Sequence, residues 1–284
     1  MSETIQPISV NRILVSLDNS THSTAALEAA VELARHYNAE LRGVFIEDIT
    51  LLNLSKMSFC QEVGEHTATV RKITTEGVSR GIHVQSRWVI KSFRKITNST
   101  GINAAFVVLR GGVHQMIEQE ALSCDLIVIG KTGTNPLRGR RLGSTAKALI
   151  EKHTKPLLLI EEHTHLGYPM IVKYSPTPFG KTSLETAKAL LNPKETLVIL
   201  LNKDDPHHFS QEITQLQLWA AEHNIKVSFE GVKTGASQTF FRMLNGLKTG
   251  LLILPHEETV RELGFMRRCL DEVRLPILLI RDNG

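Results

Sequence analysis

The chain has 284 residues, 42% of them hydrophobic and 22% charged, which is typical of a soluble globular protein with about two domains. No apolar run reaches the ~18 to 20 residues that span a bilayer, and residues 1–10 lack the basic start and apolar core of a signal peptide. The net charge of +4 comes from 33 basic and 29 acidic residues, largely interspersed, so no nucleic-acid or membrane partner is expected. Three scattered cysteines, Cys60, Cys124 and Cys269, form no metal-ligand spacing and indicate a reducing cytoplasm.

The first predicted elements are a strand, a helix and a second strand. Residues 12–18 form an apolar run that ends in an acid, and residues 19–21 offer helix caps. A stripe of small residues at helical spacing then continues to about Tyr37, and residues 39–47 form the next strand. This order predicts a parallel pair of strands with a right-handed crossover.

Residues 49–101 are predicted to be helical, as one long helix or two consecutive ones. Their apolar residues recur at spacings near three to four, although the alternation over residues 82–90 also fits a strand. The remaining elements of this half are strands at 104–109, 126–129 and 156–160, and helices at 113–122 and from 144 to about 153.

Residues 161–168 are predicted to be a linker, after which the alternation of strands and helices starts again. The strands expected there are 170–173, 196–201, 227–231, 251–254 and 276–280, and the helices are 181–191, 211–223, 238–246 and 258–273. Residues 276–280 parallel 156–160, and 250–254 parallel 125–129, so the two halves look like repeats. The predicted fold class is therefore α/β, with two repeated, open, five-stranded parallel sheets of flavodoxin-like or Rossmann-like type.

A glycine-rich segment after the fourth strand is the strongest motif in the chain. Gly130 and Gly133 follow that strand, and nine residues later Gly143 and Ser144 open a helix. This arrangement presents backbone N–H groups to an anion at a helix N-terminus. The spacing is neither the Walker pattern nor the dinucleotide fingerprint. The second half is five residues shorter in the corresponding stretch and lacks the glycine series.

The spacing Gly-x2-Gly-x9-Gly-Ser resembles the ATP-binding signature of the universal stress protein family, and the repeat architecture is similar to its tandem members. The resemblance implies the adenine-nucleotide α-hydrolase-like fold, with an ATP-binding domain at residues 1–162 and a degenerate domain at 167–284. In this family the acid after strand one contacts the nucleoside, and Asp18 matches it. If the family pattern carries over, backbone groups around Ser16 and Ile46 hold adenine.

The remaining expected ligands of the nucleotide follow from the glycine segment. Gly130 and Gly133 allow backbone to approach a phosphate, and the helix start adds N–H groups and hydroxyls at Gly143, Ser144 and Thr145. Nearby basic side chains could add charge, namely Lys131, Arg138, Arg140 and Arg141. The ligand implied is ATP, with ADP or AMP as alternatives and with Mg²⁺ as an optional companion. No nucleotide is expected in the second half, where residues 173–175 replace Ser16, Leu17 and Asp18.

The function implied is that of an ATP-binding stress-response regulator in the cytoplasm, without dedicated catalytic residues. The alternative is an enzyme acting on the phosphates of adenine nucleotides, such as a slow ATPase, but the sequence offers no general base. A decayed scaffold is a third reading, favoured for the second half alone. The two halves are expected to pair through their last strands as an internal pseudo-dimer, because an apolar edge strand must be covered. Whether whole chains also form a homodimer stays open.

Overall fold

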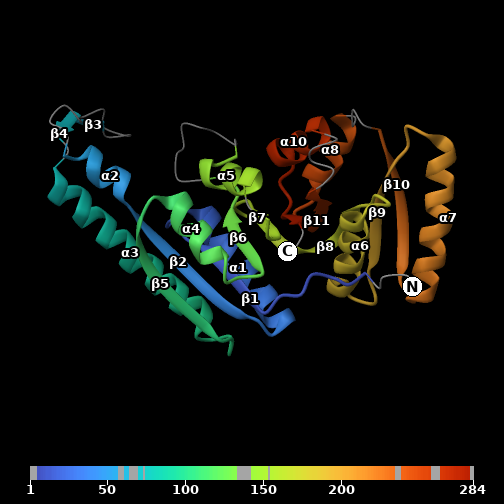
Figure 1. Cartoon of the computed structure of the whole chain (residues 1–284), viewed down its shortest axis with the longest axis horizontal. Helices are drawn as coiled ribbons and strands as arrows, with labels where there is room; N and C mark the ends of the chain where they lie inside the picture. Colours follow the sequence, from blue (N-terminus) through green and yellow to red (C-terminus); the bar gives the residue numbers. More distant parts are fainter. Residues whose placement is uncertain are drawn as a thin grey trace.

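The computed structural model describes residues 5–56, 61–63, 70–72, 74–132, 142–152, 154–233, 238–256 and 263–281. They form a ten-stranded sheet in the order β10-β9-β8-β11-β12-β7-β6-β1-β2-β5 (Figure 1). The first half supplies β1 (Arg12–Ser16), β2 (Glu40–Asp48), β5 (Ala104–Gly111), β6 (Leu126–Gly130) and β7 (Leu157–Ile160). The second half supplies β8 (His165–Lys173), β9 (Thr196–Asn202), β10 (Lys226–Val232), β11 (Thr249–Pro255) and β12 (Ile277–Ile280).

Each half orders its strands 3-2-1-4-5 along the sheet. Neighbouring strands within a half run parallel, which confirms the predicted mixed α/β class. The last strands of the two halves pair antiparallel, with Leu158 opposite Leu278, as the apolar edges require. The two five-stranded units predicted from the sequence are therefore halves of one continuous sheet.

Helices cover both faces of the sheet because successive strand residues point to opposite sides. One face packs against α1 (Thr21–Tyr37), α3 (Thr75–Thr97), α6 (Pro178–Leu190) and α7 (Pro206–Glu222). The other face packs against α4 (Val113–Ala121), α5 (Ser144–Lys152), α8 (Gln238–Gly246) and α10 (Leu263–Glu272). Helices α3 and α7 lie at opposite ends of the molecule (Figure 1).

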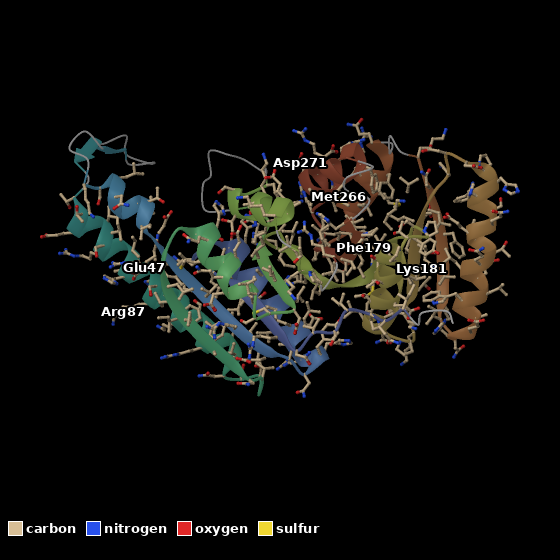
Figure 2. All side chains as sticks on the ribbon, viewed as in Figure 1. Glu47, Arg87, Phe179, Lys181, Met266 and Asp271 are labelled. Carbon is tan, nitrogen blue, oxygen red and sulfur yellow. The ribbon has the colours of Figure 1, made fainter. Side chains whose placement is uncertain are left out.

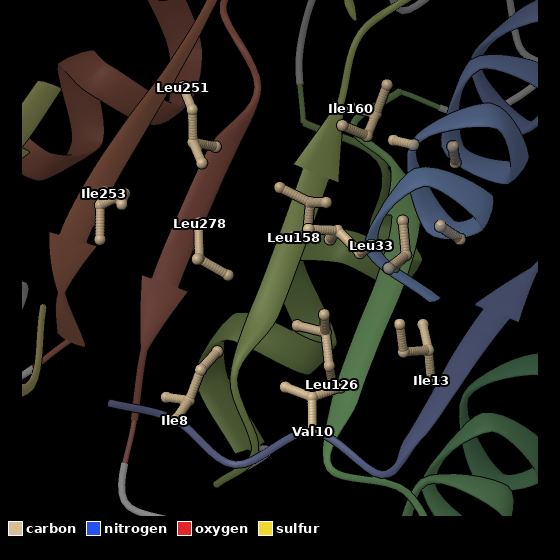
Figure 3. Close-up of a cluster of buried hydrophobic side chains, with 14 of the residues drawn as sticks. Ile8, Val10, Ile13, Leu33, Leu126, Leu158, Ile160, Leu251, Ile253 and Leu278 are labelled. Atoms are coloured by element: carbon tan, nitrogen blue, oxygen red, sulfur yellow. The ribbon is translucent and has the colours of Figure 1, made fainter. Parts of the chain in front are cut away.

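The hydrophobic core runs without a break across the junction between the halves. Leu158 and Leu278 lie on neighbouring strands and belong to one buried cluster, together with Ile13 of the first half and Ile253 of the second (Figure 3). The N-terminal segment crosses the same junction, and the backbone N–H of Ile8 donates to the buried hydroxyl of Thr186 in α6 at 3.1 Å. The segment before β1 thus packs on the second half.

Two predictions on connecting segments need correction. The 49–101 region is not all helix: it holds α2 (Ile49–Leu54), a two-stranded hairpin of β3 (Gln61–Val63) and β4 (Val70–Lys72), and then α3. The helical reading of residues 82–90 is confirmed, because Ile82, Val89 and Phe93 form the buried stripe of α3. The linker is shorter than 161–168, since β8 already begins at His165 and only residues 161–164 separate it from β7.

Two glycines give a matched test of the packing. A Cβ on Gly43 would lie 2.5 Å from the Phe93 ring and 2.7 Å from the Phe106 ring, so Gly43→Ala should lower the free energy of unfolding by about 1–3 kcal/mol. Gly81 lies in α3 with nothing within 4 Å of such a Cβ, so Gly81→Ala should raise it by about 0.5–1 kcal/mol. Urea unfolding measures both, and equal midpoints for the two variants would contradict this packing.

Candidate functional site

The candidate site lies where β1 and β6 end side by side. These strands run parallel, with Val15 opposite Val128, so Asp18 and the glycine segment emerge at the same edge of the sheet. Strand order reverses between β1 and β6 within the first half, since β2 lies on one side of β1 and β6 on the other. Ligands of open α/β sheets bind at such switch points, beyond the carboxyl ends of the strands.

Asp18 is exposed and shapes the entry to α1. Its Oδ1 accepts from the backbone N–H of Ser20 at 3.1 Å and from the Ser20 hydroxyl at 2.6 Å. Ser20 in turn caps α1 by accepting the N–H of Ser23. One carboxylate oxygen therefore holds the turn, while the exposed carboxyl group remains accessible to a ligand.

Ser16 and Ile46 lie on the neighbouring strands β1 and β2, near the end of β1 that precedes Asp18. Ser16 is the last residue of β1 and lies opposite Val44 in β2. The C=O of Val44 accepts the N–H of Leu17 at 2.9 Å, so the backbone groups of Ile46, two residues further, face the same side beyond the end of β1. The half-buried Ile46 side chain packs on the core that contains α4 and α5, so only its backbone faces the crevice.

Gly130 is needed for packing. A Cβ there would meet the Cβ of His22 at 2.9 Å and its carbonyl carbon at 3.3 Å. The absence of a side chain lets the first turn of α1 lie directly over the end of β6. The glycine thus brings the N-terminus of α1 to the start of the glycine segment.

The far end of the glycine segment is held close to its start. The N–H of Gly143 donates to the C=O of Lys131 at 2.9 Å, and Gly143 then begins α5 by accepting the N–H of Lys147 at 2.9 Å. Ser144 is exposed and Thr145 half-buried in the first turn of α5. The predicted ligands Gly133 and Arg140 lie outside the described residues, as do Arg138 and Arg141.

Lys131 corrects the prediction that it adds charge beside a phosphate. It is only 1% exposed, and its ammonium donates to the C=O of Val273, the residue that follows α10 in the second half. Desolvation lowers its pKa, and the carboxylate of Glu161 at 3.9 Å opposes that shift. The side chain therefore points toward the second half.

The sequence motifs did not point to His22 or Glu162, which the structure places in this region. His22 accepts the N–H of Glu162 on Nδ1 at 2.9 Å, so its proton is assigned to Nε2, which lies 2.6 Å from the Thr132 hydroxyl. The Glu162 carboxylate accepts from the Thr21 hydroxyl. These contacts tie α1, the glycine segment and the connection between the halves together, and they depend on residues about 110 and 140 positions apart.

The corresponding place in the second half carries different residues. The N–H of Tyr174 donates to Leu200 at 3.0 Å, as Leu17 does to Val44, so Ser175 stands where Asp18 stands. Ser175 is buried, and a Cβ on Gly180 would lie 2.3 Å from its carbonyl oxygen, so α6 presses on it directly.

The described groups can bind an anion and a hydroxylated ligand through backbone N–H groups and one carboxylate. Among the residues that the structure describes, no group of three metal-ligating side chains comes together. No helix in those same ranges is long and apolar enough to cross a membrane.

Comparisons with known proteins agree with this architecture. The chain is 27% identical over 152 residues to the universal stress protein YxiE of Bacillus subtilis, covering 53% of this chain and 98% of that protein. A universal stress protein structure from Archaeoglobus fulgidus matches with a TM-score of 0.68 and 13% identity, over 97% of this chain and 99% of the other, which concerns the fold alone. A universal stress protein solved in complex with cAMP covers 54% of this chain and 99% of its own, with 16% identity and a TM-score of 0.38. The family model of universal stress proteins matches residues 9–161, just over half of the chain, and the chain therefore belongs to the universal stress protein family.

Proposed function

We propose that the first half binds one adenine nucleotide, with ATP as the main ligand, in the crevice between β1 and β6. The observation that carries the proposal is that β1 and β6 end side by side, so that Asp18 and the residues at the two ends of the glycine segment leave the sheet at the same edge. The nucleoside would lie between Asp18 and the backbone of Ser16 and Ile46. The phosphates would lie at the helix start, where free N–H groups and the helix dipole favour negative charge.

The role that fits this site is regulation through bound nucleotide. Among the described residues of the crevice, His22 is the one imidazole, and both of its ring nitrogens already have partners. A general base for phosphate cleavage is thus not provided by that side chain. The second candidate function, a slow ATPase or nucleotide transferase, would take its base from the exposed carboxylate of Asp18.

The second half fits a repeat of the same domain that has lost its site. It shares the strand order of the first half, but the buried Ser175 stands where the exposed Asp18 stands in the first half, which supports this proposal. We propose that the two halves form an internal pseudo-dimer, and that a homodimer of whole chains is a further option. The cytoplasm is the proposed compartment, and Mg²⁺ would accompany the phosphates if it binds.

We expect one nucleotide per chain. Isothermal calorimetry with ATP should give a stoichiometry near one, because the second half has a buried Ser175 in place of Asp18 and lacks the glycine series. Two equivalent sites would contradict the assignment of the second half, and no heat with millimolar ATP would contradict the proposed function itself.

The variant Asp18→Asn distinguishes the structural role of Asp18 in the turn before α1 from its proposed role in binding the nucleotide. The amide oxygen can still accept from Ser20, so α1 should keep its start and the thermal midpoint should stay close to that of the parent. A carboxylate hydrogen bond is worth about 1.5–3 kcal/mol, so affinity for ATP should fall by at least about tenfold. The matched control is Asp205→Asn, which alters a similar helix cap on α7 in the second half and should leave affinity unchanged. Equal affinity of the Asp18 variant and the parent would remove Asp18 from the site.

Separate expression of residues 1–162 and 163–284 tests the pseudo-dimer. Each half would expose an apolar last strand, so we expect aggregation of the single halves or their association on mixing, seen by size-exclusion chromatography with light scattering. Two soluble monomeric halves that do not associate on mixing would contradict the pseudo-dimer.

A further inference from the structure

Lys131 is a charged side chain buried in the junction between the halves. It follows Gly130 at the end of β6, yet its ammonium reaches the C=O of Val273 in the second half. The last carbonyls of a helix have no partner within the helix, and cations near that end satisfy them. Lys131 thus supplies from the first half a hydrogen bond at the C-terminal end of α10.

The charged groups around Lys131 come from both halves. Glu161, which follows β7, lies 3.9 Å from the ammonium. The negative charge of Asp271 in α10 (labelled in Figure 2) also opposes the lowering of the Lys131 pKa by burial. A buried ammonium without such partners would be costly. The position of Lys131 is therefore fixed by the docking of the second half, and not by the local chain alone.

The main chain of Lys131 holds the two ends of the glycine segment. Its N–H donates to Ile160 at 2.7 Å, and its C=O accepts from Gly143 at 2.9 Å. Thr132, the next residue, is held by His22 at 2.6 Å. The backbone of Lys131 therefore holds the base of the glycine segment, and its side chain contacts the second half.

The second half also holds the other end of the same unit. Arg281, which follows β12, donates from Nη1 to the C=O of Leu149 at 3.1 Å and from Nη2 to that of Ile150. His256, which follows β11, lies with Nε2 3.2 Å from the same Ile150 oxygen. These carbonyls belong to the last turns of α5, the helix whose N-terminus faces the proposed phosphates. Helices α5 and α10 accordingly lie on the same side of the sheet, near its middle (Figure 1).

We propose that the second half positions the phosphate-binding unit of the first, with Lys131 at the base of the glycine segment and Arg281 with His256 at the end of α5. This rests on the proposed nucleotide site and adds a task for the half that has no site. Lys131 and Arg281 are positioning residues that do not touch the nucleotide. Because such a link is reciprocal, nucleotide bound in the first half also favours docking of the second.

The test compares two losses of stability in the full-length chain. Lys131→Met keeps an unbranched apolar stem but removes the donor to Val273, so the base of the glycine segment loses its anchor. The control is Leu216→Ala, which removes a buried side chain of α7 at the far end of the second half. Both variants should have a lower thermal midpoint without ligand. We expect only Lys131→Met to weaken ATP binding, by about tenfold in Kd by calorimetry.

A second variant keeps the test decisive if Lys131→Met does not fold. Arg281→Leu removes the donors to Leu149 and Ile150 and leaves Lys131 in place, and it should raise Kd several-fold relative to the Leu216→Ala control. Lower thermal midpoints with the parental Kd in the folded variants would overturn the positioning role. No ATP binding by the parent would overturn the proposed function, and the positioning role with it.

Discussion

The antiparallel pairing of β7 with β12 is the constraint on which the rest of the molecule depends. Both strands are short, apolar and buried on both faces, so neither can form the edge of a sheet in water. Their pairing makes one sheet of ten strands and one core that includes Leu158 and Leu278. It also brings α5 and α10 together, which is why Lys131 and Arg281 can each reach the helix end of the other half. The edges that remain, β5 and β10, lie at the two ends of the sheet.

The two halves share a strand order but differ after their first strands. After the first strand of each half, the same backbone hydrogen bond is made by Leu17 and by Tyr174. Beyond it, Asp18 is exposed, whereas Ser175 is covered by the close approach of Gly180 in α6. The two halves thus share a strand order but present different groups after their first strands. The second half contacts the first through Arg281 and His256, whose side chains reach the carbonyls at the end of α5.

Much of the fold was predictable because its strands are apolar runs and its helices carry a stripe at helical spacing. The pairing of the last strands followed from the same physics, since residues 156–160 and 276–280 would otherwise be exposed edges. The β3–β4 hairpin was missed because its strands are only three residues long each, and β8 begins earlier than its apolar run suggests. The prediction that Lys131 adds charge beside a phosphate was wrong. The contacts of His22 with Thr132 and Glu162 were not predicted. Such partners are distant in sequence, and pattern alone does not reveal them.

The central claim is that the nucleotide lies at the switch point of the first half. A crystal structure of the full chain grown with ATP tests it most directly. The account predicts density for one nucleotide per chain, with the ribose beside Asp18, the phosphates at Ser144 and Thr145, and the Lys131 ammonium still on the Val273 carbonyl. A nucleotide bound in the second half beside Ser175, or one bound elsewhere while the Asp18 crevice stays empty, would contradict it.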